Sequence, residues 1–202
     1  MSASGVPQAP NLGLRARNRQ RAMREIQRVA LDLFDARGFD AVTVEEVAAM
    51  AEVSASTVYR YFGTKDRLVL HDDIDRQMVT GLLAALDEGA TLGEAARLVL
   101  GNLRAMSAEF RSFARRIRYM LEQPTVAAAL AQEARATAVE LSAEIARRRG
   151  RAADDLEVRL SAQVLIEVLL ISAEAWHRSG FRTDFGELLD RTLTAAERGL
   201  MH

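Results

Sequence analysis

The chain of 202 residues contains no cysteine, one tryptophan and three prolines. Without thiols it forms no disulfide and no thiolate metal site, a composition that is compatible with a reducing cytoplasm. Two of the three prolines, Pro7 and Pro10, lie in the first ten residues. Almost all of the remaining chain is therefore free to be helical.

Long apolar runs and strand-like alternation are also missing. The most apolar run, Val164–Ile171, is interrupted by Glu167 and is too short to span a bilayer. No continuous apolar segment occurs near the N-terminus, so we expect no secretory signal. Val, Ile and Thr nowhere alternate over the length of a strand, and the chain is predicted to be all-α, with about nine helices.

Residue patterns typical of catalysis are absent. The three histidines, at positions 71, 177 and 202, are too scattered for a recognisable catalytic arrangement, and HExxH, GxSxG and glycine-rich phosphate loops do not occur. His71 and Asp75 share one helix face, and we interpret them as a solvated surface, not as metal ligands. We therefore expect no enzyme, no cofactor and no metal site.

One stretch, Thr43–Lys65, organises the chain. Thr43 followed three residues later by Glu46 is the capping-box pattern of a helix start, and Val44, Val47, Ala48 and Ala51 then recur at helical spacing. After a break at residues 52–53, Ser54 can cap a second short helix that reaches about Phe62. Two short helices joined by a tight turn predict a helix-turn-helix over residues 43–62.

The second of these helices presents a polar outer face. Val58 and Phe62 are four residues apart and point inward, which leaves hydroxyl, alanine, tyrosine and arginine side chains on the outside. Small residues let a helix lie deep in a DNA groove, and Tyr, Arg and Lys donate to phosphates and base edges. The outer set comprises Ser54, Ala55, Ser56, Thr57, Tyr59, Arg60 and Tyr61, followed by Lys65.

Charge is distributed unevenly, although the net charge is only −1. The range Arg15–Arg28 contains six arginines and one acidic residue, Glu25. Such a local basic stripe is typical of a phosphate-binding surface. A solvated, partly disordered tail is the alternative interpretation.

The chain divides into three predicted parts: a disordered basic tail, a DNA-binding domain of three helices, and a larger helical domain. A helix over about residues 154–178 is apolar on nearly every face, so it must be covered on more than one side, by internal helices or by a second chain. The predicted bounds are 1–17 for the tail, 18–65 for the DNA-binding domain and 66–202 for the rest. The predicted helices lie at about 18–37, 43–51, 54–62, 64–86, 91–107, 109–121, 125–149, 154–178 and 184–200.

The sequence of residues 20–80 resembles that of the tetracycline-repressor (TetR) family of bacterial transcriptional regulators. The matching strings are Ala30–Phe39, Thr43–Ala51, Val53-Ser54, Thr57–Phe62 and Lys65-Asp66, in order and at the family's spacings. Glu52 departs from the pattern, because the turn of the family often carries glycine there. If this residue is left-handed, its side chain costs about 1–2 kcal/mol.

The resemblance implies a dimeric repressor that reads a pseudo-palindromic operator in double-stranded DNA. Two copies of the helix at Ser54–Tyr61 would enter successive major grooves, about 34–36 Å or a multiple of a helical turn apart. By residue match Ser54, Ala55, Ser56, Thr57 and Tyr59 would touch bases or the adjoining backbone, with Arg60 beside them. Thr43, Tyr61 and Lys65 fall where the family contacts phosphates.

The resemblance also implies a small-molecule effector in the C-terminal bundle and a homodimer through the last two helices. Candidate lining residues combine apolar bulk with polar tips: Met106, Phe110, Phe113, Tyr119, Met120, Trp176 and His177. Plain core packing is the alternative for each of them. Residues 115–118 could meet an acidic ligand or form an exposed face, and residues 120–124 resemble the mycofactocin-regulator-like branch. A helical module that dimerises or binds proteins, without specific DNA binding, is the rival to the whole interpretation.

Overall fold

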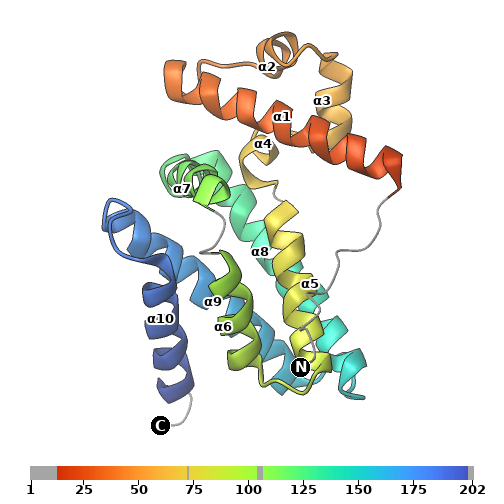
Figure 1. Ribbon diagram of the computed structural model, residues 1–202, viewed down its shortest axis with the longest axis vertical. Helices are drawn as coiled ribbons and strands as arrows, with labels where there is room; N and C mark the ends of the chain where they lie inside the picture. The colour runs from red at the N-terminus through yellow and green to blue at the C-terminus, as the bar shows by residue number, and fades with distance from the viewer. Residues whose placement is uncertain (1–12, 72, 104–106, 200–202) are drawn as a thin grey trace, which may run out of the picture. The chain divides into compact units, whose positions relative to one another are not determined.

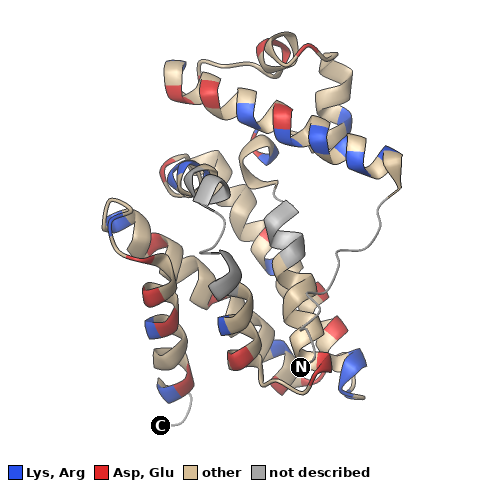
Figure 2. Cartoon of the chain, viewed as in Figure 1, with Lys and Arg blue, Asp and Glu red and all other residues tan. Residues whose placement is uncertain are grey.

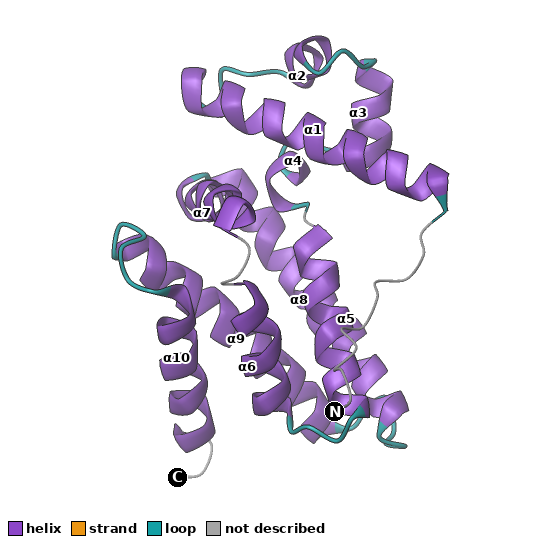
Figure 3. Cartoon of the chain, in the orientation of Figure 1, coloured by secondary structure: helices purple, strands orange, loops and turns teal. Residues whose placement is uncertain are grey.

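A computed structural model describes residues 13–71, 73–103 and 107–199 (Figure 1). Within these ranges the chain is helical and has no strand, which confirms the predicted all-α class (Figure 3). The described part forms ten helices and divides into two compact units, the first ending at Gly63 and the second beginning at Thr64. Among the helices of these ranges, none combines the length and the apolar character that crossing a membrane requires.

The first unit consists of three helices around a small apolar core. They are α1 (Leu14–Arg37), α2 (Val44–Met50) and α3 (Ala55–Phe62). From α1 the core receives Ile26, Ala30 and Phe34, each at most 1% exposed. The Phe34 ring lies 4.9 Å from the ring of Phe39, which follows the end of α1 and closes the core. Leu14–Arg17, assigned to the tail from sequence, form the first turn of α1.

Local hydrogen bonds set the bounds of α2 and its turn. The Thr43 amide donates to Glu46 Oε2 at 2.8 Å, and the Glu46 amide donates to Thr43 Oγ1 at 3.2 Å, which completes the predicted capping box. After α2 the chain turns at Glu52, whose φ of 55° is left-handed. The amides of Glu52 and Val53 donate back to the carbonyls of Ala49 and Ala48, a Schellman ending that has Glu52 at the position glycine usually takes.

The second unit is a bundle of seven helices. They are α4 (Arg67–Leu70), α5 (Asp73–Asp87), α6 (Leu92–Leu103), α7 (Ser107–Glu122), α8 (Pro124–Arg148), α9 (Leu156–Arg178) and α10 (Phe185–Gly199). Helix α9 packs against α7, α8 and α10, which supplies the multiple cover predicted for this apolar helix. Its buried side chains join those of α5, α6, α8 and α10 in one core.

The predicted single helix over residues 64–86 is wrong. It is divided into α4, which ends at Leu70, and α5, which begins at Asp73. His71 adopts an extended backbone with ψ of 124°, so the helix cannot continue through it. The carbonyls of Val69 and Leu70 accept hydrogen bonds from the distant Arg116 side chain. The last carbonyls of α4 are thus bound by a side chain distant in sequence, and not only within a continuing helix.

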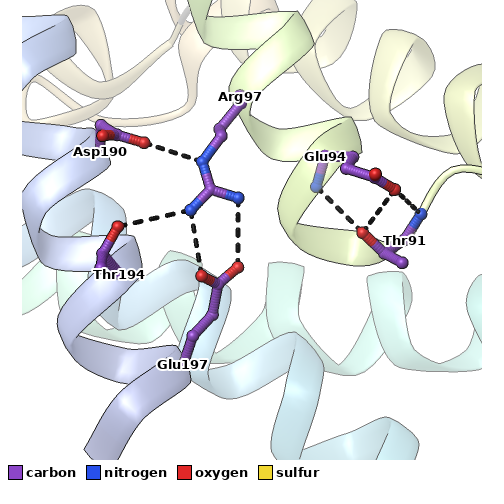
Figure 4. A network of polar contacts seen from close by, with 6 residues as sticks. All are labelled: Thr91, Glu94, Arg97, Asp190, Thr194 and Glu197. Carbon is purple, nitrogen blue, oxygen red and sulfur yellow. Dashed lines mark hydrogen bonds and ion pairs between the residues drawn. The ribbon is translucent and has the colours of Figure 1, made fainter.

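A polar network joins α6 to α10 across the bundle (Figure 4). Arg97 of α6 donates through Nε to Asp190 Oδ1 at 2.8 Å and through Nη2 to Glu197 Oε2 at 3.0 Å, and both acids belong to α10. These acids raise the pKa of the guanidinium further above its ordinary value. One arginine thus holds two acids that lie about two helical turns apart on α10, and these bonds tie α10 to α6.

Candidate nucleic-acid interface and bundle cavity

Helix α3 has a buried and an exposed side, as the sequence predicts. Val58 and Phe62 are 1% and 3% exposed and fix the helix in the first unit. The Ser54 hydroxyl accepts a hydrogen bond from the Thr57 amide at 3.2 Å and thereby caps the helix. It also lies 2.9 Å from the hydroxyls of both Ser56 and Thr57, so three hydroxyls cluster at the first turn. Ala55 beside them is half-buried.

Two tyrosines extend this face. Tyr59 is 46% exposed, and its hydroxyl donates to Glu45 Oε1 of α2 at 3.2 Å. Partial desolvation and the neighbouring Glu45 carboxylate raise the pKa of Tyr59. The Tyr61 ring lies beneath two guanidinium groups, those of Arg19 at 5.4 Å and Arg60 at 5.1 Å. Positive charge from α1 and α3 is thus gathered around one aromatic ring.

The six arginines of the predicted basic stripe are all exposed on α1 (Figure 2). They do not contribute equally, because Arg28 pairs with Glu25 at 2.5 Å and with Asp32 at 2.8 Å. Its positive charge is therefore largely compensated within α1. Arg15, Arg17, Arg19 and Arg21 precede these acids and supply the N-terminal half of α1 with positive charge.

Thr43 and Lys65 lie outside α3. Thr43 is exposed, and both its amide and its hydroxyl take part in the cap of α2. Lys65 is half-buried and belongs to the second unit, two residues after Gly63 ends α3. Gly63 has a φ of 78°, a left-handed conformation that glycine adopts without strain.

The second unit contains a cavity of about 200 Å³ between its helices. Nearly all of its wall is apolar, and the polar residues among those described are Arg116, Glu133 and Thr137. Helix α7 contributes Phe113, Arg116, Ile117 and Met120, which recur at helical spacing on one face. Further lining residues are Leu70, Met78, Val79, Leu82, Ala96, Val99, Leu130, Ala134, Leu141, Leu165, Ile166, Leu169, Leu170, Ala173 and Phe185.

Arg116 is a charged side chain in this wall, and it was not among the candidate lining residues predicted from the sequence. It is 1% exposed, whereas the favoured interpretation made residues 115–118 an exposed face. Its Nε donates to the Val69 carbonyl at 2.6 Å and its Nη2 to the Leu70 carbonyl at 2.8 Å. Burial lowers the pKa of the guanidinium to about 9, against an opposing effect of the Glu133 carboxylate. The sequence did contain a signal for this burial, because Phe113, Arg116 and Met120 recur at helical spacing and therefore share one face of the helix.

The predicted pocket residues fall into three groups. Phe113 and Met120 line the cavity. Tyr119, Trp176 and His177 do not lie in the described wall: Trp176 stacks behind Phe113 with ring centroids 5.8 Å apart, and His177 Nε2 lies 2.9 Å from Glu122 Oε1. Met106 and the side chain of Phe110 lie outside the described residues.

Two family models match the chain. The model described as bacterial regulatory proteins, tetR family, matches residues 26–71, which include α2 and α3. The model described as the MftR C-terminal domain matches residues 91–201, more than half of the chain. One match or the other thus reaches into each of the two units.

Individual proteins are similar over different lengths. TcmR of Streptomyces glaucescens, an HTH-type transcriptional regulator, is 33% identical over 58% of this chain, a match that spans 47% of its own length. MftR of Mycobacterium tuberculosis, a proposed mycofactocin biosynthesis transcriptional regulator, is 27% identical over 80% of this chain and 83% of its own.

Among solved structures, the TetR-family repressor FadR of Thermus thermophilus in complex with lauroyl-CoA superposes with a TM-score of 0.53 at 26% identity. The match covers 86% of this chain and 92% of that one.

Proposed function

The chain belongs to the TetR family of bacterial regulatory proteins and is a DNA-binding transcriptional regulator, and on this premise we propose that it is a homodimeric repressor. It binds a pseudo-palindromic operator in the cytoplasm and leaves it when a small apolar molecule occupies the cavity of the second unit. The observation that carries the proposal is the outer face of α3, a capped helix with exposed hydroxyl, tyrosine and arginine side chains and two buried anchors.

The operator is read by α3. The Ser54, Ser56 and Thr57 hydroxyls reach base edges or the adjoining backbone, because small polar side chains allow close approach in the major groove. Tyr59 and Arg60 extend the contact along the groove, while Thr43, Tyr61 and Lys65 bind phosphates. The Glu45 carboxylate holds the Tyr59 hydroxyl from α2, so the ring meets DNA in a fixed orientation.

The effector is an apolar small molecule. The cavity of about 200 Å³ has an almost entirely apolar wall. The Thermus thermophilus repressor that shares this fold was solved with lauroyl-CoA. A medium-length hydrocarbon chain also suits the apolar wall of the present cavity, because it loses no hydrogen bond on entering. To release DNA, the effector must bind more tightly to a dimer conformation whose two DNA-reading units do not match the operator half-sites than to the conformation that does match them.

The dimer forms through α9 and α10. Leu156, Leu160 and Ile171 of α9 are 77%, 54% and 47% exposed and share one helix face, on which Val164 is half-buried. A second copy of this face would cover them. A two-fold axis between the copies matches the symmetry of a palindromic operator.

The test is selection of bound duplexes from a random DNA library, followed by binding titrations of the recovered sequence at two salt concentrations. We expect a palindrome with half-sites a whole number of helical turns apart, and a logarithmic affinity that falls linearly with logarithmic salt. Weak binding with no recovered motif would refute the operator and favour the protein-binding module.

A further inference from the structure

The ring of Tyr61 brings together two guanidinium groups from different helices. That of Arg60, the preceding residue of α3, lies 5.1 Å from the ring centroid, and that of Arg19 on α1 lies 5.4 Å from it. Arg60 also reaches back along α3, where its Nη2 donates to Thr57 Oγ1 at 3.4 Å. A continuous series of contacts thus runs from the hydroxyls at the start of α3, through Arg60 and Tyr61, to α1.

The exposed arginines of α1 lie on two different faces of this helix. Arg15 and Arg19 are four residues apart and share the face that meets Tyr61. Arg17 and Arg21 each follow two residues later, which turns them by roughly 200° about the helix axis. The basic stripe of α1 therefore consists of two surfaces, and the one that carries Arg19 adjoins α3.

The charge on this face is not neutralised within the described part of the chain. No carboxylate there pairs with Arg15, Arg19 or Arg60, whereas Arg28, further along α1, pairs with two acids. Figure 2 shows the same division, with basic residues in the N-terminal half of α1 and acidic residues towards its other end. Cations gathered around one ring repel each other, and a bound anion removes this repulsion. The cluster therefore favours an anionic partner.

The position beside α3 indicates that this partner is a phosphate of DNA. An α-helix with its side chains is about 10–12 Å across and the major groove is about 12 Å wide, so a helix in the groove has a phosphate strand near each flank. Arg19 lies on the flank of α3 that Tyr61 marks, where it meets the backbone of DNA and not the base edges. Arg15 lies about one helical turn further along α1 and reaches a neighbouring phosphate.

We propose that α1 binds DNA through the face of Arg15 and Arg19 alone, and that Tyr61 holds the Arg19 guanidinium against a phosphate at the edge of the groove occupied by α3. The inference rests on the proposed function, since it adds a second helix to the same operator contact. A guanidinium already held on a ring loses less freedom on binding than a mobile one. Phosphates carry no sequence information, so α1 strengthens binding to every duplex while α3 selects the operator.

The test compares two double variants that remove the same charge from the two faces of α1. The full-length protein is titrated with the selected operator at several salt concentrations. For Arg15→Met/Arg19→Met we expect an affinity loss of at least about 100-fold, since each lost charge-assisted hydrogen bond costs roughly 10-fold. The slope of log affinity against log salt should fall by about 4, for two phosphates in each half-site. Arg17→Met/Arg21→Met is the matched control, with a loss below about 3-fold through screened long-range attraction.

Two further measurements connect Arg19 to its phosphate and to Tyr61. Operators with a single uncharged methylphosphonate are scanned position by position, and one position that weakens the wild type should have no effect on Arg19→Met. Arg19→Met should also cost less affinity in a Tyr61→Leu protein than in a Tyr61→Phe protein, because phenylalanine keeps the ring. Urea unfolding of all variants provides the structural readout. If Arg19 only fastened α1 to α3, Arg19→Met would lower the stability and leave the salt slope unchanged, which would contradict the phosphate contact.

The outcomes separate this inference from the proposed function. Equal losses for the two double variants would overturn the inference, because they would show attraction by net charge and not contact by one face, and they would leave the operator intact. Unchanged affinity and slope for Arg15→Met/Arg19→Met would also overturn it and place this face clear of the DNA. Recovery of no operator by the wild-type protein would overturn the proposed function together with the inference.

Discussion

The DNA contacts proposed for Lys65 and Thr57 are of two different kinds. A lysine on a phosphate neutralises charge whatever the sequence. Lys65→Ala should therefore weaken binding to all duplexes and, with one Lys65 in each chain of the dimer, reduce the slope of log affinity against log salt by about 2. Thr57→Ala should instead change which bases the protein prefers, at an almost constant slope. Titrations of selected and scrambled duplexes at several salt concentrations distinguish the two. An unchanged slope for Lys65→Ala would remove Lys65 from the phosphate contacts.

Glu52 has a left-handed backbone conformation, which is unfavourable for a residue that carries a Cβ atom. Its φ of 55° costs an L-residue about 1–2 kcal/mol. Glycine would relieve this strain in the folded state, but it would also make the unfolded chain more flexible, which offsets part of the stabilisation. Glu52→Gly should therefore raise the free energy of unfolding by about 1 kcal/mol. Urea unfolding measures the change.

Glu52→Ala is the matched control for this substitution. Alanine removes the carboxylate and keeps the Cβ atom, so the backbone strain remains and the stability should stay close to that of the wild type. An equal gain for alanine and glycine would show that the carboxylate, and not the left-handed backbone, is responsible.

Glu46 gives α2 a stability that depends on pH. Hydrogen bonding from the Thr43 amide, followed by the Arg37 guanidinium, lowers the pKa of Glu46 below its ordinary value of 4.5. The folded state therefore favours the ionised carboxylate, and its contribution is complete above pH 4.5 and lost as the pH falls through the lower folded pKa. Glu46→Gln should be less stable than the wild type at pH 7, and the difference should shrink on acidification.

The measurement is urea unfolding of both proteins between pH 7 and pH 3. Glu94 caps α6 through the same bonds with Thr91 and also has a lowered pKa, so Glu94→Gln in the second unit serves as a comparison. A Glu46→Gln difference that stays constant down to pH 3 would contradict the assignment.

The bounds of most elements could be predicted because they are decided locally. Thr43, Ser54 and Thr91 cap helices through the residue three positions further on, and the sequence shows such patterns directly. The end of α4 could not be predicted, because its carbonyls are bound by Arg116, 46 or 47 positions along the chain. The cavity was predicted only in part for the same reason: periodicity shows that Phe113 and Met120 share a face, but not which helices meet it.

The association of two chains is a property of the whole molecule, and the exposed apolar face of α9 provides its test. Leu160 is 54% exposed on this face, one helical turn after Leu156. Leu160→Glu would place an unpaired carboxylate in the dimer interface, a costly burial that should dissociate the dimer. Sedimentation at micromolar concentration should give the mass of two chains for the wild type and of one for the variant.

Leu98→Glu provides the matched control for this dimer test. Leu98 is 57% exposed on α6, so the substitution changes charge and apolar surface to the same degree on a helix outside the proposed interface. It should leave both the mass and the operator affinity unchanged. Leu160→Glu should lose tight operator binding together with the dimer, since a single chain reads only one half-site and forfeits the second contact. A wild-type mass of one chain, or a Leu160→Glu variant that remains dimeric, would rule out this face as the interface.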